Sequence, residues 1–445
     1  MFKTIKNAWS IPDLRKKILF TILIIVVFRF GSIVPVPFLD GVALKTLMDS
    51  VMSNSNGTAL GYLDMLSGGA FSNATLFAMG VSPYINSSII MQLLTVAIRP
   101  LERMAKEGEE GRKKIATITR YVTVGLGLLQ GLAYYFYLRN SSVDGRNIVL
   151  YRDGASGVFV AFIIVLAFTA GTALMMWMGE QINQKGIGNG ISMLLFAGIV
   201  ARLPTTVNTL MMYFNQAVES PSTSGQFFVL VPLFVVMFLA VIWVIVFMQD
   251  SERRIPVQYA KRVVGRKMYG GQSSHIPIKI AMSGVMPIIF ASSILSIPST
   301  IQMFMGGNVS GFWASFFNAF SPNGWLYCVL YFFLIIMFSY FYLTIQYNPV
   351  EMANNLRQNN GTIPGIRPGK PTSDFISKIL SKITLIGALF LALIALLPIV
   401  YGAVTGMHGL SLGGTSILII VGVALETMKQ LESQMLMRHY KGFLD

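Results

Sequence analysis

Ten apolar runs recur along the chain and are separated by segments rich in polar residues. A transmembrane helix needs about 20 consecutive apolar residues to cross the hydrocarbon core of a bilayer, and each run reaches that length. The pattern therefore predicts an all-α polytopic membrane protein with ten transmembrane helices. The runs cover residues 18–38, 75–97, 116–138, 157–179, 190–213, 226–249, 277–305, 324–347, 376–400 and 411–432.

Composition supports the same class. The 445 residues are 54% hydrophobic and only 12% charged, whereas a soluble domain carries about 25% charged residues. So little charge cannot cover a water-facing surface, which excludes a soluble enzyme and a disordered scaffold. The single cysteine, Cys328, excludes an intrachain disulfide. The histidines His275, His408 and His439 are too scattered for a metal-ligand set, so we expect no metal and no cofactor.

The basic residues are distributed unevenly between the two sides of the predicted membrane protein. We assign 28 of the 34 Lys and Arg to one side of the membrane, counting those near the ends of runs, and five to the other, while Arg29 belongs to the first run. Because Lys and Arg gather on the cytoplasmic side, this distribution predicts cytoplasmic N- and C-termini. The first run has no small-residue cleavage site, so we interpret it as a spanning helix rather than a signal peptide.

Two predicted cytoplasmic loops are longer and more basic than a simple connection requires. They cover about 250–276 and 348–375, within the net charge of +15 of the whole chain. Two interpretations remain open: a solvated signal that sets membrane topology, or a surface that docks a large partner with anionic groups. The basic residues are Arg253, Arg254, Lys261, Arg262, Arg266 and Lys267 in the first loop, and Arg357, Arg367 and Lys370 in the second.

Residues 60–73, LGYLDMLSGGAFSN, are moderately apolar but too short and too broken to span. Irregular backbone at membrane depth must be buried in protein or line a water-filled cavity. Because the next apolar run follows within a few residues, we expect this segment to fold back toward the centre of the bundle as a re-entrant element. The alternative is an ordinary external loop.

The sequence carries no complete motif for catalysis or phosphate binding. GIRPGKPT, Gly365 to Thr372, has three residues between its glycines where a P-loop has four, and Pro371 replaces the Ser or Thr after the lysine. Paired carboxylates at membrane depth are also lacking, and Arg29 is a lone charge within its run. Ion-coupled transporters usually carry ionisable groups there, so this absence disfavours such a transporter.

Aliphatic pairs and small polar residues occupy the middles of several runs. Val81 and Ile85, and likewise Ile191 and Leu195, are spaced four apart and share one helical face. This spacing alone is typical of side chains that face lipid or pack between helices. The polar residues in apolar runs, which suit hydrogen bonds between helices, are Asn86, Ser87, Gln130 and Ser292.

Six motifs in the correct order resemble the SecY family, the central subunit of the bacterial protein-translocation channel. The resemblance extends from about residue 10 to residue 440, and the set is far more specific than any one motif. The motifs are MLSGGAFSNATLFAMGVSPYINSSIIMQLLT (65–95), KEGEEGRKK (106–114), GEQINQKGIGNGIS (179–192), RRIPVQYAKR (253–262), PGIRPGKPT (364–372) and GGTSILI (413–419).

The resemblance implies a fold of two pseudo-symmetric five-helix halves, residues 1–215 and 216–445, around a central pore. It places a ring of aliphatic side chains at the narrowest point of that pore, at Val81, Ile85, Ile191, Leu195, Ile289 and Ile419. It identifies the segment 60–73 as a plug that closes the external side, with Leu63, Met65, Leu66, Ser67, Gly68 and Gly69 as its central residues.

The resemblance also implies a lateral gate and a set of partners. The gate opens toward lipid between the second and third helices of one half and the seventh and eighth of the other. Asn86, Ser87, Gln130 and Ser292 are candidates for its polar seam, and Arg253, Arg254, Arg262, Arg367 and Lys370 for partner docking. The expected partners are SecE and SecG in a heterotrimer, the SecA motor ATPase, the ribosome, secretory precursors with signal sequences, and lipids of the bacterial cytoplasmic membrane.

A protein-conducting channel without covalent chemistry of its own is the function that the resemblance implies, and three other functions are alternatives to it. A small-solute transporter suits ten helices but requires a polar or charged site near the midplane. An intramembrane enzyme requires a catalytic constellation that the sequence lacks. An accessory channel with a narrower substrate range is not separated from a housekeeping channel by the sequence.

Overall fold

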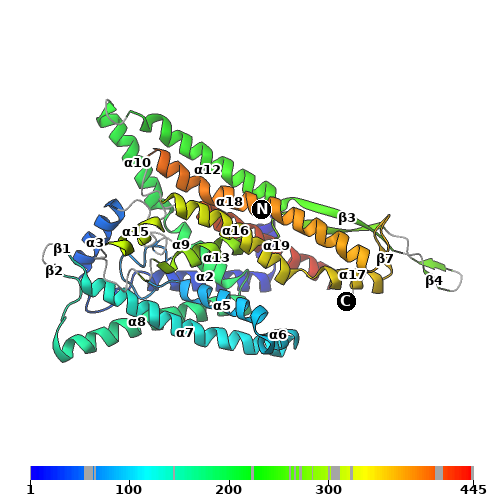
Figure 1. Ribbon diagram of the computed structural model, residues 1–445, viewed down its shortest axis with the longest axis horizontal. Coiled ribbons are helices and arrows are strands. Elements are labelled where there is room, and N and C mark those ends of the chain that lie inside the picture. The colour runs from blue at the N-terminus through cyan, green and yellow to red at the C-terminus, as the bar shows by residue number, and fades with distance from the viewer. Residues whose placement is uncertain are drawn as a thin grey trace.

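The computed structural model describes most of the chain and shows a long bundle of helices with a β-hairpin at one end (Figure 1). The described residues are 2–54, 64, 67–143, 146–221, 225–259, 262–264, 267–269, 273–282, 284–298, 301, 311–320, 324–405 and 414–441. The helices are α1 (Phe2–Ser10), α2 (Pro12–Gly31), α3 (Gly41–Asn54), α5 (Ser82–Ala97), α6 (Arg99–Lys106), α7 (Glu109–Asn140), α8 (Gly154–Lys185), α9 (Gly190–Val200), α10 (Leu203–Glu219), α12 (Phe227–Asp250), α13 (Met286–Leu295), α15 (Phe312–Ala319), α16 (Trp325–Gln346), α17 (Pro349–Gln358), α18 (Lys370–Thr405) and α19 (Gly414–Lys441).

Six helical stretches within the described residues are long and apolar enough to cross a membrane. Their outer faces carry large exposed apolar side chains, which suits contact with lipid rather than water. The expectation of a helical multi-pass membrane protein is therefore confirmed. The stretches are Glu109–Asn140, Gly154–Lys185, Gly190–Glu219, Phe227–Asp250, Trp325–Gln358 and Lys370–Gly402.

The other four predicted runs coincide with α2, α5, α13 and α19, and the total of ten spanning helices stays a prediction. Helix α13 is an apolar helix of ten residues. Helices α2 and α19 carry charged residues along with their apolar ones.

Proline decides where several helices begin, and this differs from the predicted boundaries. Helix α5 starts at Ser82 rather than at residue 75, with Pro83 in its first turn. Helix α13 starts at Met286 rather than at 277, again with a proline, Pro287, in the first turn. A proline there is favourable because its missing N–H would have no intrahelical partner.

The predicted run 190–213 forms two helices, α9 and α10, which are separated at Ala201 and Arg202. Pro204 lies in the first turn of α10. The break brings the backbone N–H of Arg202 to the carbonyl of Ile199 at 3.0 Å.

The first long basic loop is built on a β-hairpin. Strand β3 (Glu252–Tyr259) pairs antiparallel with β6 (Ser273–Lys279), with Ile255 opposite Ile276. Alternate residues of a strand face opposite sides, and Ile255 and Val257 are buried while their neighbours are exposed. The short strands β4 (Arg262–Val264) and β5 (Lys267–Tyr269) pair near the tip, and β1 (Ser142–Val143) pairs with β2 (Arg146–Asn147) at the opposite end of the molecule (Figure 1).

Strand β7 (Gly361–Thr362), from the second basic loop, pairs with β3, with Gln258 opposite Thr362. A small apolar core anchors this three-stranded sheet to α17 and α18. That core contains Ile255, Val257, Ile278, Leu356, Ile363, Ile376, Leu380 and Ile383. The described parts of the two basic loops therefore form one unit, called the hairpin unit, rather than two separate loops.

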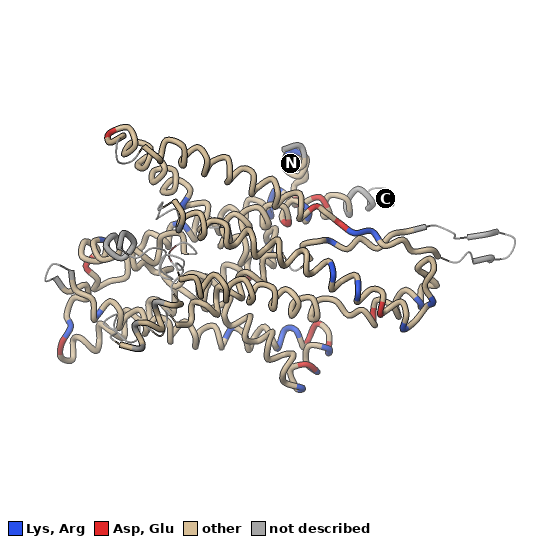
Figure 2. The backbone as a smooth tube through the Cα atoms, turned by 45° about the horizontal axis from the view of Figure 1, so that its top comes forward, with Lys and Arg blue, Asp and Glu red and all other residues tan. Residues whose placement is uncertain are grey.

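Charged residues are concentrated at the end of the molecule that carries the hairpin, as Figure 2 shows. The same region receives both chain termini, because α1 packs against α19: the Thr4 hydroxyl donates to Glu432 Oε1 at 3.2 Å, and Ala8 shares a buried cluster with Leu431. The largest apolar core lies deeper in the bundle and joins residues from α2, α5, α8, α9, α12, α13, α16, α18 and α19.

Candidate functional site

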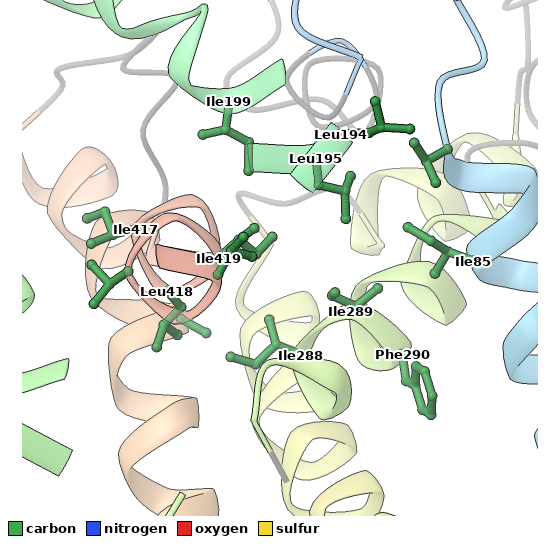
Figure 3. Close-up of a cluster of buried hydrophobic side chains, with 14 of the residues drawn as sticks. Ile85, Leu194, Leu195, Ile199, Ile288, Ile289, Phe290, Ile417, Leu418 and Ile419 are labelled. Atoms are coloured by element: carbon green, nitrogen blue, oxygen red, sulfur yellow. The ribbon is translucent and has the colours of Figure 1, made fainter. Parts of the chain in front are cut away.

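Aliphatic side chains from four helices converge in the centre of the bundle. In Figure 3, Ile85, Leu195, Ile289 and Ile419 project from α5, α9, α13 and α19 toward a common region. Val81, at the start of α5, belongs to the same buried cluster. None of the five is more than 9% exposed. Five of the six residues expected at the ring are thus buried members of one cluster.

Ile191, the sixth expected residue, packs against the same cluster without being one of its fully buried members. It is only partly buried, and its Cδ1 atom would lie 2.5 Å from a Cβ placed on Gly179 of α8. Ile191 therefore packs against the bare backbone of α8. The α9 residues that line the adjoining cavity are Asn189, Ser192 and Leu195.

Helix α9 is held against α8 by a close contact between backbones. A Cβ on Gly190 would lie 1.9 Å from the carbonyl oxygen of Gly179, so only glycine fits there. The Asn183 side chain accepts from the N–H of Gly190 at 2.8 Å, and the Asn189 side chain accepts from Ile191 at 3.1 Å as the helix cap. These hydrogen bonds fix the first turn of α9 and hence the direction of Leu195.

A cavity of about 520 Å³ adjoins the aliphatic residues on the side that carries the hairpin. Leu195, Ile289 and Ile419 contribute to its apolar part, and the rest of the wall mixes apolar residues with polar and charged ones. The polar wall residues include Asn189, Ser192, Gln249, Lys279, Gln346, Glu426 and Lys429. Lys429 forms an ion pair with Asp250 at 2.7 Å, joining α19 to α12. The cavity is therefore partly polar, and its apolar part adjoins the aliphatic cluster.

The plug candidate is described only in part. Leu63, Met65 and Leu66 lie outside the described residues. Ser67, Gly68 and Gly69 form a turn in which both glycines have positive φ, at 67° and 90°. The Ser67 hydroxyl donates to the Asp64 carbonyl at 3.0 Å and accepts from the Phe71 N–H at 3.0 Å.

This turn lies inside the bundle. Ser67 is 1% exposed. A Cβ on Gly68 would lie 2.9 Å from the backbone of Gly198 in α9. Ala70 belongs to the same core as the aliphatic ring residues. The described part of the segment is therefore seated against α9, one turn beyond Leu195.

A buried ion pair beside the turn was missed by sequence reasoning. Asp64, with a side chain 1% exposed, pairs with Arg202, with a side chain 14% exposed. The charge count places Arg202 in an external segment, and the structure buries it. Arg29, interpreted from the sequence as a lone charge, donates from Nη1 to the Gly68 carbonyl at 3.4 Å. The sequence feature that could have indicated this ion pair is the acidic residue Asp64 among the apolar residues of LDML.

The lateral-gate candidates lie on three helices. Ser87 on α5 is buried and donates to the Thr119 carbonyl of α7 at 2.8 Å, so this bond joins α5 to its own neighbour. Ser292 on α13 is buried and donates within its helix to Ile289 at 3.0 Å. Asn86 and Gln130 are half-buried. Helices α5 and α13 are in direct contact, which places Ser87 and Ser292 on the two helices that meet.

The docking candidates lie on the hairpin unit. Arg253 and Arg254 are exposed on β3, and Arg254 also pairs with Glu252 at 2.7 Å. Arg367 and Lys370 are exposed where the second loop enters α18, and the Arg367 carbonyl accepts from Thr372 Oγ1 at 2.8 Å. Arg262 lies on β4. Among the described residues, no group of three or more His, Cys, Asp or Glu could hold a metal ion.

Known proteins are similar to this chain over almost all of its length. A family model described as SecY matches residues 75–428. The protein translocase subunit SecY of Streptomyces galbus is 44% identical over 453 aligned residues, covering 100% of each chain.

Two solved structures share the architecture. A structure on the plug domain of the SecY protein aligns with a TM-score of 0.64 at 16% identity, covering 94% of this chain and 92% of that chain. Sec61 in a canine ribosome-channel complex from the endoplasmic reticulum aligns with a TM-score of 0.60 at 15% identity and the same coverage. At such low identity, these two similarities show the shared fold alone.

Proposed function

Because this chain belongs to the SecY family of non-enzymatic translocase channel subunits, we propose that its five converging aliphatic residues seal a protein-conducting pore. The chain is a multi-pass membrane protein and a protein-conducting channel of the translocon. The convergence of Val81, Ile85, Leu195, Ile289 and Ile419 is the observation that carries the proposal.

Aliphatic side chains suit a pore that must pass a polypeptide without leaking ions. A narrow apolar constriction excludes water and ions by dewetting. Its side chains offer no hydrogen bond or charge to a passing chain, so they surround the chain without binding it. The partly polar cavity beside Leu195 can hold a hydrated polypeptide before it reaches the constriction.

The plug and the lateral gate complete the proposed channel. The turn at Ser67 to Gly69 closes the external side at rest, supported by its burial against α9. Helices α5 and α7 form one side of the gate, and α13 and α16 form the other. The gate opens at the contact between α5 and α13. An apolar signal-sequence helix that binds the open state better would shift the population toward that state. The halves 1–215 and 216–445 move apart at this seam, and transmembrane segments leave sideways into lipid.

Partner docking is assigned to the hairpin unit. Its exposed basic residues, Arg253, Arg254, Arg367 and Lys370, are held on one sheet and its small core. A rigid basic platform suits a large anionic partner. We assign it to the ribosome, which the canine Sec61 complex contains, and to the SecA motor. SecE and SecG complete a heterotrimer in the bacterial cytoplasmic membrane, with the hairpin and both termini in the cytoplasm.

Ion conductance tests the seal directly. The chain with its partner subunits would be placed in planar bilayers, and Ile85→Ser and Leu195→Ser would be measured singly and together. We expect each serine to raise resting conductance and the double variant to raise it further, because hydroxyls let water enter the constriction. Leu128→Ser is the matched control, since Leu128 is 50% exposed on the outer face of α7. Conductance equal to that of the control would refute the assignment of the seal to these residues.

A further inference from the structure

We infer that Asp64 and Arg202 form a latch that holds the plug segment in its closed seat. The inference rests on the proposed role of this segment as a plug and adds the residues that fix its position. Asp64 belongs to the segment, whereas Arg202 belongs to the junction between α9 and α10. Their ion pair is thus a direct link between the part that must move and the wall against which it rests.

The acidic partner is held on the plug side by the segment itself. Asp64 is fully buried. Its Oδ1 atom accepts from the Ser72 N–H at 2.8 Å, and its backbone carbonyl accepts from the Gly69 N–H at 2.9 Å. Its other carboxylate oxygen pairs with Arg202. The carboxylate therefore folds the turn 67–72 and docks it at the same time.

The basic partner is held on the wall side. The Arg202 N–H donates to the Ile199 carbonyl at 3.0 Å, and the Arg202 carbonyl accepts from the Thr206 N–H at 3.1 Å. A Cβ on Gly69 would lie 3.7 Å from the guanidinium of Arg202. The guanidinium thus lies against the turn at Gly69, and its backbone is fixed by the helix junction.

A second arginine adds positive charge to the seat that faces Asp64. Arg29, at the end of α2, donates to the Gly68 carbonyl at 3.4 Å. A Cβ on Gly68 would lie 2.9 Å from Arg29 Nη1. The seat therefore presents two guanidinium groups to the plug turn, and Asp64 is the anion that the plug brings to them. This charge pattern favours the docked position of the segment.

Burial gives the latch a release mechanism. Two opposite charges attract strongly in a region of low dielectric constant and weakly in water, because the energy scales inversely with that constant. Separating a buried pair in the dry, closed state leaves an unpaired charge without solvation, which is strongly unfavourable. Once a polypeptide opens the pore and water enters, both charges become solvated and the latch weakens. The closed plug is therefore held tightly and released by hydration of the open channel.

A buried reporter measures the plug position without relying on transport. The reporter is Ser67→Cys in a Cys328→Ser background, because Ser67 is 1% exposed in the closed seat. The full chain with its partner subunits, in sealed vesicles, would be treated with a membrane-impermeant maleimide from the external side. Asp64→Asn, Arg202→Gln and the double variant are compared with the parent. Arg152→Gln, at a half-buried position away from the plug turn and with a polar contact to Asn147, is the matched control.

We expect a protected reporter in the parent and in the control, and a labelling rate raised at least about ten-fold in each single variant, equivalent to about 1.4 kcal/mol. The double variant should label no faster than the faster single variant, because interacting residues are not additive. Asp64→Glu, which keeps the charge, should stay closer to the parent than Asp64→Asn.

Two controls keep the result interpretable. A second reporter, Ala133→Cys, lies fully buried in α7 and must stay protected, which separates local plug opening from unfolding. Unchanged labelling in both single variants, or effects that add in the double variant, would overturn the latch while leaving the plug in place. Rapid labelling of the parent itself would overturn the closed plug position and the latch together.

Discussion

The hydroxyl of Tyr134 donates a 2.7 Å hydrogen bond to the backbone carbonyl of Phe71, and their ring centroids lie 4.4 Å apart. Tyr134 is fully buried in α7, and Phe71 lies two residues after Gly69, near the end of the segment 60–73 that we assign to the plug. The contact fixes the end of that segment to the helix bundle while the turn itself rests on α9. Movement of the plug is therefore expected to pivot near Phe71 rather than to involve the chain beyond it.

Tyr134→Phe tests this anchor. The change removes the donor but keeps the ring, so the Phe71 carbonyl is left buried without this partner. We expect a loss of about 1–3 kcal/mol in unfolding free energy, the usual cost of an unsatisfied buried polar group. Thermal unfolding in detergent would measure it as a lower midpoint. Tyr121→Phe is the control, because Tyr121 is 75% exposed on the same helix; equal midpoints for the two variants would contradict the anchor.

Gly190→Ala tests the backbone contact that positions α9. The added methyl group would lie 1.9 Å from the carbonyl oxygen of Gly179, so α8 and α9 must separate. We expect a destabilisation of about 1–3 kcal/mol from overpacking, together with raised resting conductance because Leu195 is displaced. Thermal unfolding and bilayer recordings would be combined.

Gly125→Ala is the matched control for this change. No atom lies within 4 Å of the position that its Cβ would occupy, and Gly125 is within α7. Replacing a glycine inside a helix by alanine is expected to stabilise by roughly 0.5–1 kcal/mol. A Gly190→Ala variant as stable as Gly125→Ala would show that the two helices are not in tight contact.

Thr21→Val tests the link between α2 and the turn that precedes α9. Thr21 Oγ1 accepts from the buried N–H of Ile187 at 3.0 Å. Valine has nearly the same shape but no acceptor, so we expect about 1–3 kcal/mol of destabilisation from the unpaired N–H. Thr117→Val on the exposed face of α7 removes only a hydroxyl bonded to its own helix, to Lys113, and should have little effect. The thermal unfolding midpoints of the two variants would be compared. A smaller decrease of the midpoint for Thr21→Val than for Thr117→Val would contradict the role of Thr21 in linking α2 to this turn.

Arg367→Glu tests partner docking by the hairpin unit. Arg367 is exposed, so the variant should fold normally and keep the resting conductance of the parent. We expect motor-driven translocation, measured as ATP-dependent protection of a precursor from protease, to fall about ten-fold or more because the reversed charge repels an anionic partner. Arg112→Glu, an exposed arginine on α7, is the comparison. Full protection with Arg367→Glu would rule out the docking role of this residue.

The membrane class and most of the helices follow from local properties of the sequence. Hydrophobic runs of sufficient length must become helices in lipid, because the backbone can satisfy its polar groups there only internally. The runs at 116–138, 157–179 and 376–400 accordingly lie within helices of the structure, and those at 226–249 and 324–347 match α12 and α16 to within one residue at each end. The misplaced boundaries lie near Pro83, Pro204 and Pro287, where turns and packing, rather than hydropathy, decide the first helical residue.

The proposed ring residues could be selected from the sequence only through family resemblance. Val81 and Ile85 have the spacing of any helical face, and nothing in that spacing separates a pore from a lipid contact. Ile419 is more than three hundred positions away from both. Only the packing of α5 against α13, and of α9 against α19, brings these aliphatic residues together.

By itself, the sequence determined that this chain is a helical multi-pass protein with its basic residues concentrated on one side, because hydrophobicity and charge act locally along the chain. The tertiary structure decided that Asp64 meets Arg202 and that the two basic loops share a sheet through β3 and β7. These partners are far apart in sequence, and no local sequence pattern around one of them predicts its pairing with the other. Their pairing depends on burial, since a charge or a strand edge removed from water must find the partner that the whole fold supplies.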